Sequence, residues 1–196
     1  MCGIFGLISQ SEINKQDLRT LAIHARQRGS DSSGLVFIDG NKYKVERADF
    51  DVKKLLKDVK PYKSSLVLGH SRLITNGFND NQPVVSNNIA VLHNGIIVNH
   101  EEVWGKIKSK PALTIDTEVI AAIAEQHFNN KGKPEDLPAR VFELCKGVAA
   151  CAVIVPNLGK LILFSNNGSL YVGKSACGTY FSSERYPLTQ AGCEKI

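Results

Sequence analysis

The order of apolar segments constrains the fold of this chain more than any other feature. Strand-like and helical patterns are mixed in the first half, helical patterns then follow one another, and four strand-like runs lie near the end of the chain. A regular alternation of strands and helices, which would indicate a parallel sheet, is missing. The order therefore predicts an α+β fold whose last strands form an antiparallel meander.

The expected elements follow from apolar periodicity and from Gly, Asn and Pro punctuation. Strands are expected at 2–9, 33–39, 42–48, 64–73, 147–156, 160–167, 169–175 and 178–183. Helices are expected at 14–27, 52–60, 100–109, 116–130 and 136–146. Residues 87–100 are expected to form a strand, a turn and a further apolar stretch. The Gly40-Asn41 pair predicts a hairpin between the second and third strands.

Length and hydropathy favour one globular domain over residues 1–196. The chain has 196 residues and 43% hydrophobic residues, enough for a substantial core. No apolar run reaches the roughly 18–20 residues that cross a bilayer, and no basic segment precedes the first apolar run as in a signal peptide. We therefore expect a cytoplasmic protein that does not associate with membranes.

Cysteine spacing and charge distribution exclude several classes of site. The five cysteines include no CxxC pair, and the five histidines show no ligand spacing. We therefore expect no metal and no other cofactor. The net charge is +5, but the lysines are scattered and not interleaved with aromatic residues. This pattern is typical of solvated helix faces and predicts no nucleic-acid binding.

The first candidate for chemistry is Cys2, which opens the apolar run CGIFGLI. A buried cysteine in an edge strand explains it without function. Alternatively, removal of Met1 leaves Cys2 with both a thiol and a free amine. That amine has a pKa of about 7.7–8.0 and can act as the base for its own side-chain nucleophile.

Two polar loops are the next candidates. RQRGSDSSG at 26–34 reads as a helix end and turn, or as a loop over the N-terminus with Arg28 near a substrate. GHSRLITNG at 69–77 follows an apolar strand. There Arg72 is either a surface residue beside a turn or a bidentate partner for a carboxylate, to which Thr75 adds a hydroxyl.

The stretches HNGIIVNH and IDTEVIAA carry the remaining candidates. Asn94-Gly95 between apolar runs is a strong hairpin signal. The alternative is that the Asn94 amide and the Gly95 backbone N–H stabilise an oxyanion. Asp116 or Thr117 is a good helix N-cap, whereas in the functional alternative Asp116 binds a substrate ammonium group.

Together and in this order, these motifs resemble the class II glutamine amidotransferases, which are N-terminal nucleophile (Ntn) hydrolases. The motifs are the N-terminal CGI, the R-G-x-D-S-x-G loop, G-H-x-R-x-x-T, HNG and the D-T-E helix start, and the similarity runs from Cys2 to about Ser183. HNGIIVNH and DTEVIA look most like the glutaminase domain of the glucosamine-6-phosphate synthases. The resemblance implies a four-layer αββα sandwich with two antiparallel sheets.

The resemblance also implies a glutaminase activity, carried over residue by residue. Cys2 would be the nucleophile that forms a glutamyl thioester, with its own amine as base. Asn94 and Gly95 would form the oxyanion hole. Arg72 would bind the α-carboxylate of the substrate, and Asp116 its α-ammonium group. Thr75 would help to orient the substrate, and Arg28 would support the N-terminus.

The chain departs from the resembled pattern at two points. Leu73 and Asn76 stand where the glucosamine-6-phosphate synthases have Trp and His, in a loop that couples the glutaminase to its synthase domain. The sequence ends at Ile196, where members of the resembled family usually continue into a synthase domain. We therefore expect a single glutaminase domain that binds L-glutamine and supplies ammonia to a separate synthase subunit or domain. The alternatives are an Ntn amidohydrolase for another amide and a non-enzymatic glutamine-sensing module.

Overall fold

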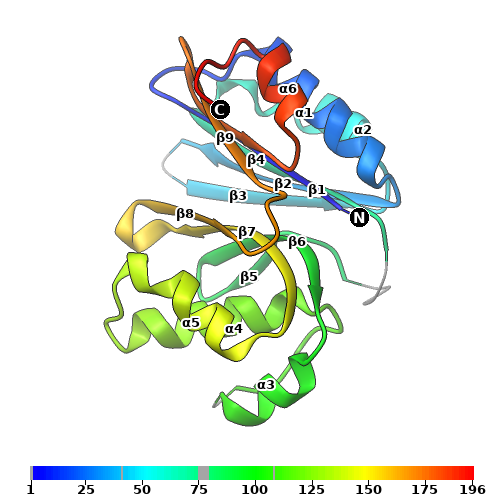
Figure 1. The fold of residues 1–196 in the computed structure, drawn as a ribbon. Coiled ribbons are helices and arrows are strands. Elements are labelled where there is room, and N and C mark those ends of the chain that lie inside the picture. The colour runs from blue at the N-terminus through cyan, green and yellow to red at the C-terminus, as the bar shows by residue number, and fades with distance from the viewer. Residues whose placement is uncertain (1, 41, 75–79, 108) are drawn as a thin grey trace.

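Two antiparallel sheets face each other in the middle of the molecule, and helices cover their outer faces (Figure 1). The structure is a computed structural model that describes residues 2–40, 42–74, 80–107 and 109–196. These four layers are the αββα sandwich implied by the resemblance. The α+β prediction is therefore confirmed.

The first sheet contains six strands. In spatial order they are β3 (Lys42–Ala48), β2 (Ser32–Asp39), β4 (Leu66–Arg72), β1 (Gly3–Ser9), β10 (Gly178–Ser182) and β9 (Tyr171–Ser175). β1 therefore lies between β4 and β10, and every neighbouring pair is antiparallel. The predicted hairpin between the second and third strands is confirmed, with Gly40 at a φ of 61°.

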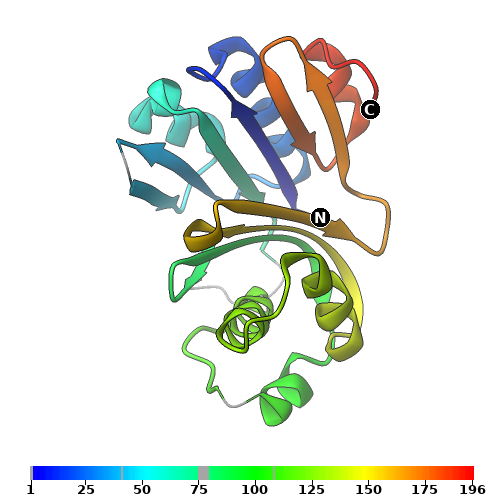
Figure 2. The same cartoon turned by 90° about the vertical axis from the view of Figure 1, so that its left-hand side faces the viewer.

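The second sheet contains four strands in the order β5 (Val84–Ser86), β6 (Ile89–Ile97), β7 (Gly147–Val155) and β8 (Lys160–Ser165). The expected meander of the last four strands is wrong in one respect. β7 and β8 belong to this sheet, whereas β9 and β10 pair in the first sheet (Figure 2). The apolar faces of both pairs line the space between the sheets, so the segment between β8 and β9 crosses from one sheet to the other.

Among the described residues, six α-helices lie on the outer faces. α1 (Lys15–Arg28), α2 (Val52–Val59) and α6 (Arg185–Gln190) cover the first sheet, and α3 (His100–Lys106), α4 (Thr117–Asn129) and α5 (Leu137–Leu144) lie on the side of the second. Sequence periodicity predicted all of them except α6, which is only six residues long and contains Pro187. β5 was also missed because three residues carry too little periodicity.

Apolar side chains fill three layers between these elements. Between the sheets lie Ile4, Val36, Leu66, Leu68, Ala90, Leu92, Ala152, Ile154 and Phe181. Separate clusters join each sheet to its helices. Gly6 makes room for Phe181 in the central layer, because a Cβ at position 6 would lie 2.2 Å from that ring.

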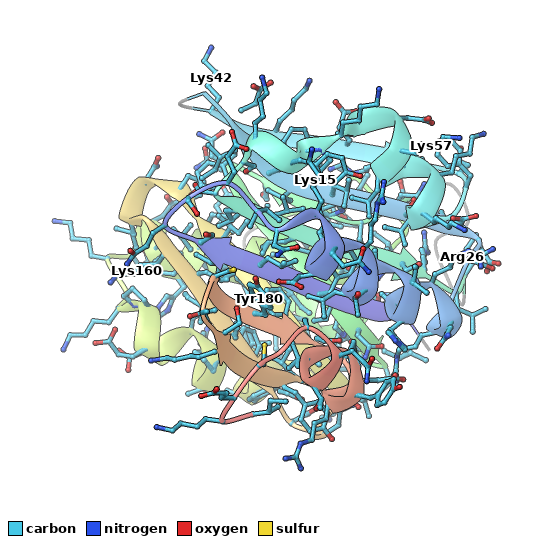
Figure 3. All side chains as sticks on the ribbon, turned by 90° about the horizontal axis from the view of Figure 1, so that it is seen from above. Lys15, Arg26, Lys42, Lys57, Lys160 and Tyr180 are labelled. Carbon is cyan, nitrogen blue, oxygen red and sulfur yellow. The ribbon has the colours of Figure 1, made fainter. Side chains whose placement is uncertain are left out.

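Charged side chains lie on separate elements around the molecule (Figure 3). Seen from above, Lys42 on β3, Lys57 on α2 and Lys160 on β8 project outward at different places. Tyr180 is instead buried and donates a hydrogen bond to the Asp17 carboxylate at 2.8 Å. No helix of the described residues is both long enough and apolar enough to cross a membrane.

Candidate active site

Side-chain alternation brings three candidate residues to one end of the space between the sheets. Residues an even number of positions apart on a strand point to the same face of the sheet. Cys2, Arg72 and Asn94 each stand at such a spacing from an apolar residue of the central layer on the same strand or on its extension. β1 and β4 pair with Gly3 opposite Ser71, so Cys2 lies beside Arg72. Residues from distant parts of the sequence therefore meet where the central core ends.

Main-chain contacts hold Cys2 in place. The Arg28 Nε donates to the Cys2 carbonyl oxygen at 2.8 Å, and the Arg28 guanidinium also pairs with Glu184 at 2.8 Å. The Cys2 thiol donates to the Leu73 carbonyl oxygen at 3.5 Å. The structure thus brings Arg28 to the N-terminal segment. Sequence reasoning missed Glu184, which no motif marks.

Arg72 is almost completely buried and is held by a polar chain. Its Nη1 donates to the Asn81 Oδ1 at 3.3 Å, and the Ser32 hydroxyl donates to the same oxygen at 2.6 Å. The Asn81 Nδ2 donates to the Asp49 carboxylate at 2.7 Å. This chain fixes the orientation of the Asn81 amide and directs its acceptor oxygen toward the guanidinium.

Asn94 and Gly95 lie inside a continuous strand. The hairpin predicted from this pair is wrong, because β6 runs through both residues and pairs with β7 from Ala90 to Ile97. Pairing along its whole length, and burial of the Asn94 side chain, outweigh the local turn preference of Asn-Gly. Gly is required at 95, since a Cβ there would lie 1.8 Å from the Val148 carbonyl oxygen.

Two polar contacts position the Asn94 segment. The Gln82 side chain forms two hydrogen bonds with the His93 backbone, accepting from its N–H at 2.6 Å and donating to its carbonyl oxygen at 3.0 Å. The Asn94 Nδ2 lies 3.5 Å from the Ser183 hydroxyl, whose oxygen accepts from the Ile4 N–H at 2.9 Å. Ser183 thereby connects the Asn94 amide to the strand that follows Cys2.

Asp116 precedes α4 at the N-cap position, but its side chain makes no capping hydrogen bond. Its Oδ2 accepts instead from the Ile97 N–H at 2.8 Å, and the side chain is buried. The carboxylate is thus held at the end of β6, close to the Asn94 segment. Thr75, the remaining predicted site residue, lies outside the described residues.

A comparison with known families assigns the chain to one of them. Residues 70–190 match the model of a family described as "Glutamine amidotransferase domain". That range contains Arg72, Asn94, Gly95 and Asp116. The chain belongs to the class II glutamine amidotransferases. The family predicted from the motifs in the sequence is therefore confirmed.

Curated relatives agree with this assignment. The glutamine–fructose-6-phosphate aminotransferase (isomerizing) of Wigglesworthia glossinidia brevipalpis is 35% identical over 96% of this chain. The protein of the same name from Helicobacter pylori is 28% identical over 93% of the chain. This amidotransferase chain spans about a third of the length of these relatives, 33% and 32% respectively.

Solved structures support the fold. The glutamine phosphoribosylpyrophosphate amidotransferase from B. subtilis has a TM-score of 0.78 at 24% identity. The match covers all of this chain and 44% of that protein. A second structure, titled as the allosteric regulatory enzyme of purine biosynthesis, has a TM-score of 0.79 at 22% identity, with the same coverage. The likeness shows that this chain shares the fold of both proteins.

The electrostatics around Cys2 keep its thiol protonated in the amidotransferase at rest. Burial raises the pKa of the Cys2 thiol above its ordinary value of 9.0, and the Asp116 carboxylate raises it further. Interaction with the Leu73 backbone and the Arg72 charge lower the pKa but do not cancel the effect of burial. A nucleophilic Cys2 would therefore need a base.

The histidines near the site are neutral. Burial, followed by the Arg72 charge, lowers the pKa of His70 to about 3. Burial also lowers the pKa of His93. Within the described part of the chain, no group of three or more His, Cys, Asp or Glu side chains is arranged to hold a metal ion.

Proposed function

We propose that the chain hydrolyses L-glutamine to glutamate and ammonia through a glutamyl thioester on Cys2. The observation that carries this proposal is the pair of opposite charges beside one thiol. Arg72 and Asp116 are both buried, and the charges of both act on the Cys2 thiol. Glutamine carries a carboxylate and an ammonium group on its α-carbon, so these two side chains complement its two charges.

In this mechanism the α-amine of Cys2, free after removal of Met1, accepts the thiol proton. The thiolate attacks the γ-amide carbon, and the Asn94 Nδ2 and Gly95 N–H stabilise the oxyanion. The carbon–nitrogen bond breaks as the ammonium group returns its proton to the departing ammonia. Water then hydrolyses the thioester to release glutamate and restore the thiol.

The proposal includes a destination for the ammonia. The curated relatives are about three times as long as this chain. Their names describe transfer to fructose 6-phosphate. We therefore propose that a synthase domain or subunit receives the ammonia. Thr75 is proposed to orient the substrate, and Arg28 to hold the N-terminal residue through the carbonyl contact described above.

Mass spectrometry tests the nucleophile directly. The intact mass is measured before and after incubation with 6-diazo-5-oxo-L-norleucine, an electrophile with the shape of glutamine. We expect a protein lacking Met1 that gains one adduct on Cys2. Cys2→Ala should gain none and should lose glutamine hydrolysis, whereas Cys177→Ala, which removes an exposed thiol, should react like the unmodified chain. Retained Met1 with no adduct would contradict the proposal.

A further inference from the structure

The second sheet extends beyond the first at the candidate active site. Ile96 pairs with Val148 across β6 and β7, and both side chains lie on the same face as Asn94. This face lines the apolar core deeper in the molecule, but here no strand of the first sheet among the described residues covers it. Ile96 is 45% exposed, Val148 43% and Val98 71%. The result is an exposed apolar ledge directly beside Cys2.

The ledge forms one wall of a pocket that contains the proposed reaction centre. The pocket has a volume of about 380 Å³ and is lined by Cys2, Asn94, Gly95, Ile96, Val98, Gly147 and Val148. None of these lining residues is ionised. Ammonia is about the size of a water molecule, which occupies about 30 Å³ in the liquid, so the departing group of glutamine leaves most of this pocket unused.

Asp116 and the pocket lie at opposite edges of β6. Successive N–H groups of a strand point to opposite edges. The Ile97 N–H donates to Asp116, whereas the next N–H, that of Val98, donates to Lys146 just before β7. Asp116 therefore lies at the edge of β6 away from β7, while Gly147 and Val148 belong to β7. Neither Arg72 nor Asp116 lines the pocket.

This arrangement has a direct consequence for a bound amide. If Arg72 and Asp116 hold the α-carbon of the substrate and Cys2 attacks its γ-carbon, the amide nitrogen points away from the charged residues. That direction leads into the apolar pocket. A substituent on the nitrogen would then lie against Ile96, Val98 and Val148, and its burial would favour binding.

We propose that this pocket is a subsite for an apolar group on the amide nitrogen, so that the chain also hydrolyses γ-glutamyl amides of apolar amines. This inference rests on the proposed thioester chemistry. The thiolate attacks the γ-carbonyl carbon, the carbon–nitrogen bond breaks, and the amine departs with the proton held by the Cys2 amine. Water then converts the thioester to glutamate and thiol.

Two amides of similar size test the chemistry of the pocket. Glutamate release is measured from L-glutamine, γ-glutamyl-isobutylamide and the cationic γ-glutamyl-(2-aminoethyl)amide. We expect the kcat/KM of the isobutylamide to reach at least about one-tenth of that of glutamine. The kcat/KM of the aminoethylamide should be lower than that of the isobutylamide by about tenfold or more, because nothing in the pocket compensates its charge. Equal rates for the two amides would overturn the proposal.

A variant locates the effect on the ledge. Val148→Asn retains the β7 backbone but makes the ledge polar, and it should lower the ratio of isobutylamide to glutamine kcat/KM by about fivefold or more. Val172→Asn on β9 is the matched control, because Val172 is similarly exposed at 41% but does not line the pocket. An unchanged ratio in Val148→Asn would show that the substituent binds elsewhere.

The outcomes separate this inference from the proposed function. Hydrolysis of glutamine with an isobutylamide kcat/KM below one-tenth overturns the subsite alone. Hydrolysis of the isobutylamide without glutamine hydrolysis supports the subsite and overturns ammonia donation. Hydrolysis of neither, with no adduct on Cys2, overturns both.

Discussion

The two sheets contribute different parts of the candidate active site. The first sheet supplies the thiol of Cys2 and the guanidinium of Arg72, at the ends of neighbouring strands. The second supplies Asn94 and Gly95 within β6, and Asp116 beside the end of that strand. The proposed nucleophile and the proposed oxyanion donors therefore belong to different sheets. Packing between the sheets, rather than any local motif, sets the geometry of the site.

The largest expected effect comes from removing Asn94, the proposed oxyanion donor of the second sheet. Asn94→Ala should lower kcat for glutamine by roughly 10²–10³-fold, the usual effect of deleting one oxyanion-hole donor. Steady-state kinetics measure the change. Asn99→Ala is the matched control, because Asn99 also links backbone groups near β7, accepting from Lys146 and donating to Leu144. If both variants lose kcat equally, Asn94 has only a structural role.

The charged contribution of the second sheet is tested by Asp116→Asn. This change retains an acceptor for the Ile97 N–H but removes the charge proposed to bind the substrate ammonium group. We expect kcat/KM for glutamine to fall by about 30- to 1,000-fold, as for the loss of one partner of a buried charge pair. Glu118→Gln is the control, since Glu118 likewise accepts from backbone N–H groups. A near-normal kcat/KM in Asp116→Asn would refute the ammonium-binding role.

The pH dependence of the free energy of unfolding tests the buried surface between the sheets. The pKa of His70 is lowered from 6.5 to about 3, so the unfolded chain binds more protons in that range and stability falls as pH falls. Between pH 7 and pH 5 the loss from this group is about 2 kcal/mol. Between pH 7 and pH 5 the free energy of unfolding, measured with urea, should fall less in His70→Leu than in the unmodified chain, by about that amount. Equal losses would indicate that His70 is protonated in the folded state.

The smallest expected effect concerns the support of Arg72 in the first sheet. Asn81→Ala removes the acceptor shared by Arg72 and Ser32, a loss of about 1 kcal/mol. We expect KM for glutamine to rise about fivefold with little change in kcat, because Asn81 positions the carboxylate anchor and does not touch the reacting atoms. Asn157→Ala, an exposed site elsewhere, should change neither constant. A selective loss of kcat would place Asn81 in the chemistry instead.

The fold could be predicted from the sequence wherever one segment carries its own signal. The long helix at 117–129 and the hairpin at Gly40 are examples, because helix periodicity and turn chemistry are local. The predicted turn at Asn94-Gly95 failed because pairing with β7 overrides the local preference. The division of the last four strands between two sheets was also missed, since it depends on which faces share the central layer.

The same distinction between local signals and contacts across the fold applies to the candidate site. Cys2, Arg72, Asn94, Gly95 and Asp116 could be proposed as site residues because their motifs match a known family in order. Their supporting residues could not, because these act through contacts across the fold. Glu184 pairs with Arg28 across 156 positions, and Asn81 reaches Ser32 across 49. No pattern in a single sequence marks such pairs.

The position of β1 between β4 and β10 has a consequence during synthesis of the protein. Cys2 emerges from the ribosome first, but the strand that flanks β1 on one side is formed by residues 178–182. Glu184 and Ser183, which hold the Cys2 segment and its neighbour Ile4, follow directly. A nascent chain therefore carries its thiol without the assembled site until residues 178–184 have been made. The proposed glutamine hydrolysis would begin only after these residues have paired with the N-terminal segment.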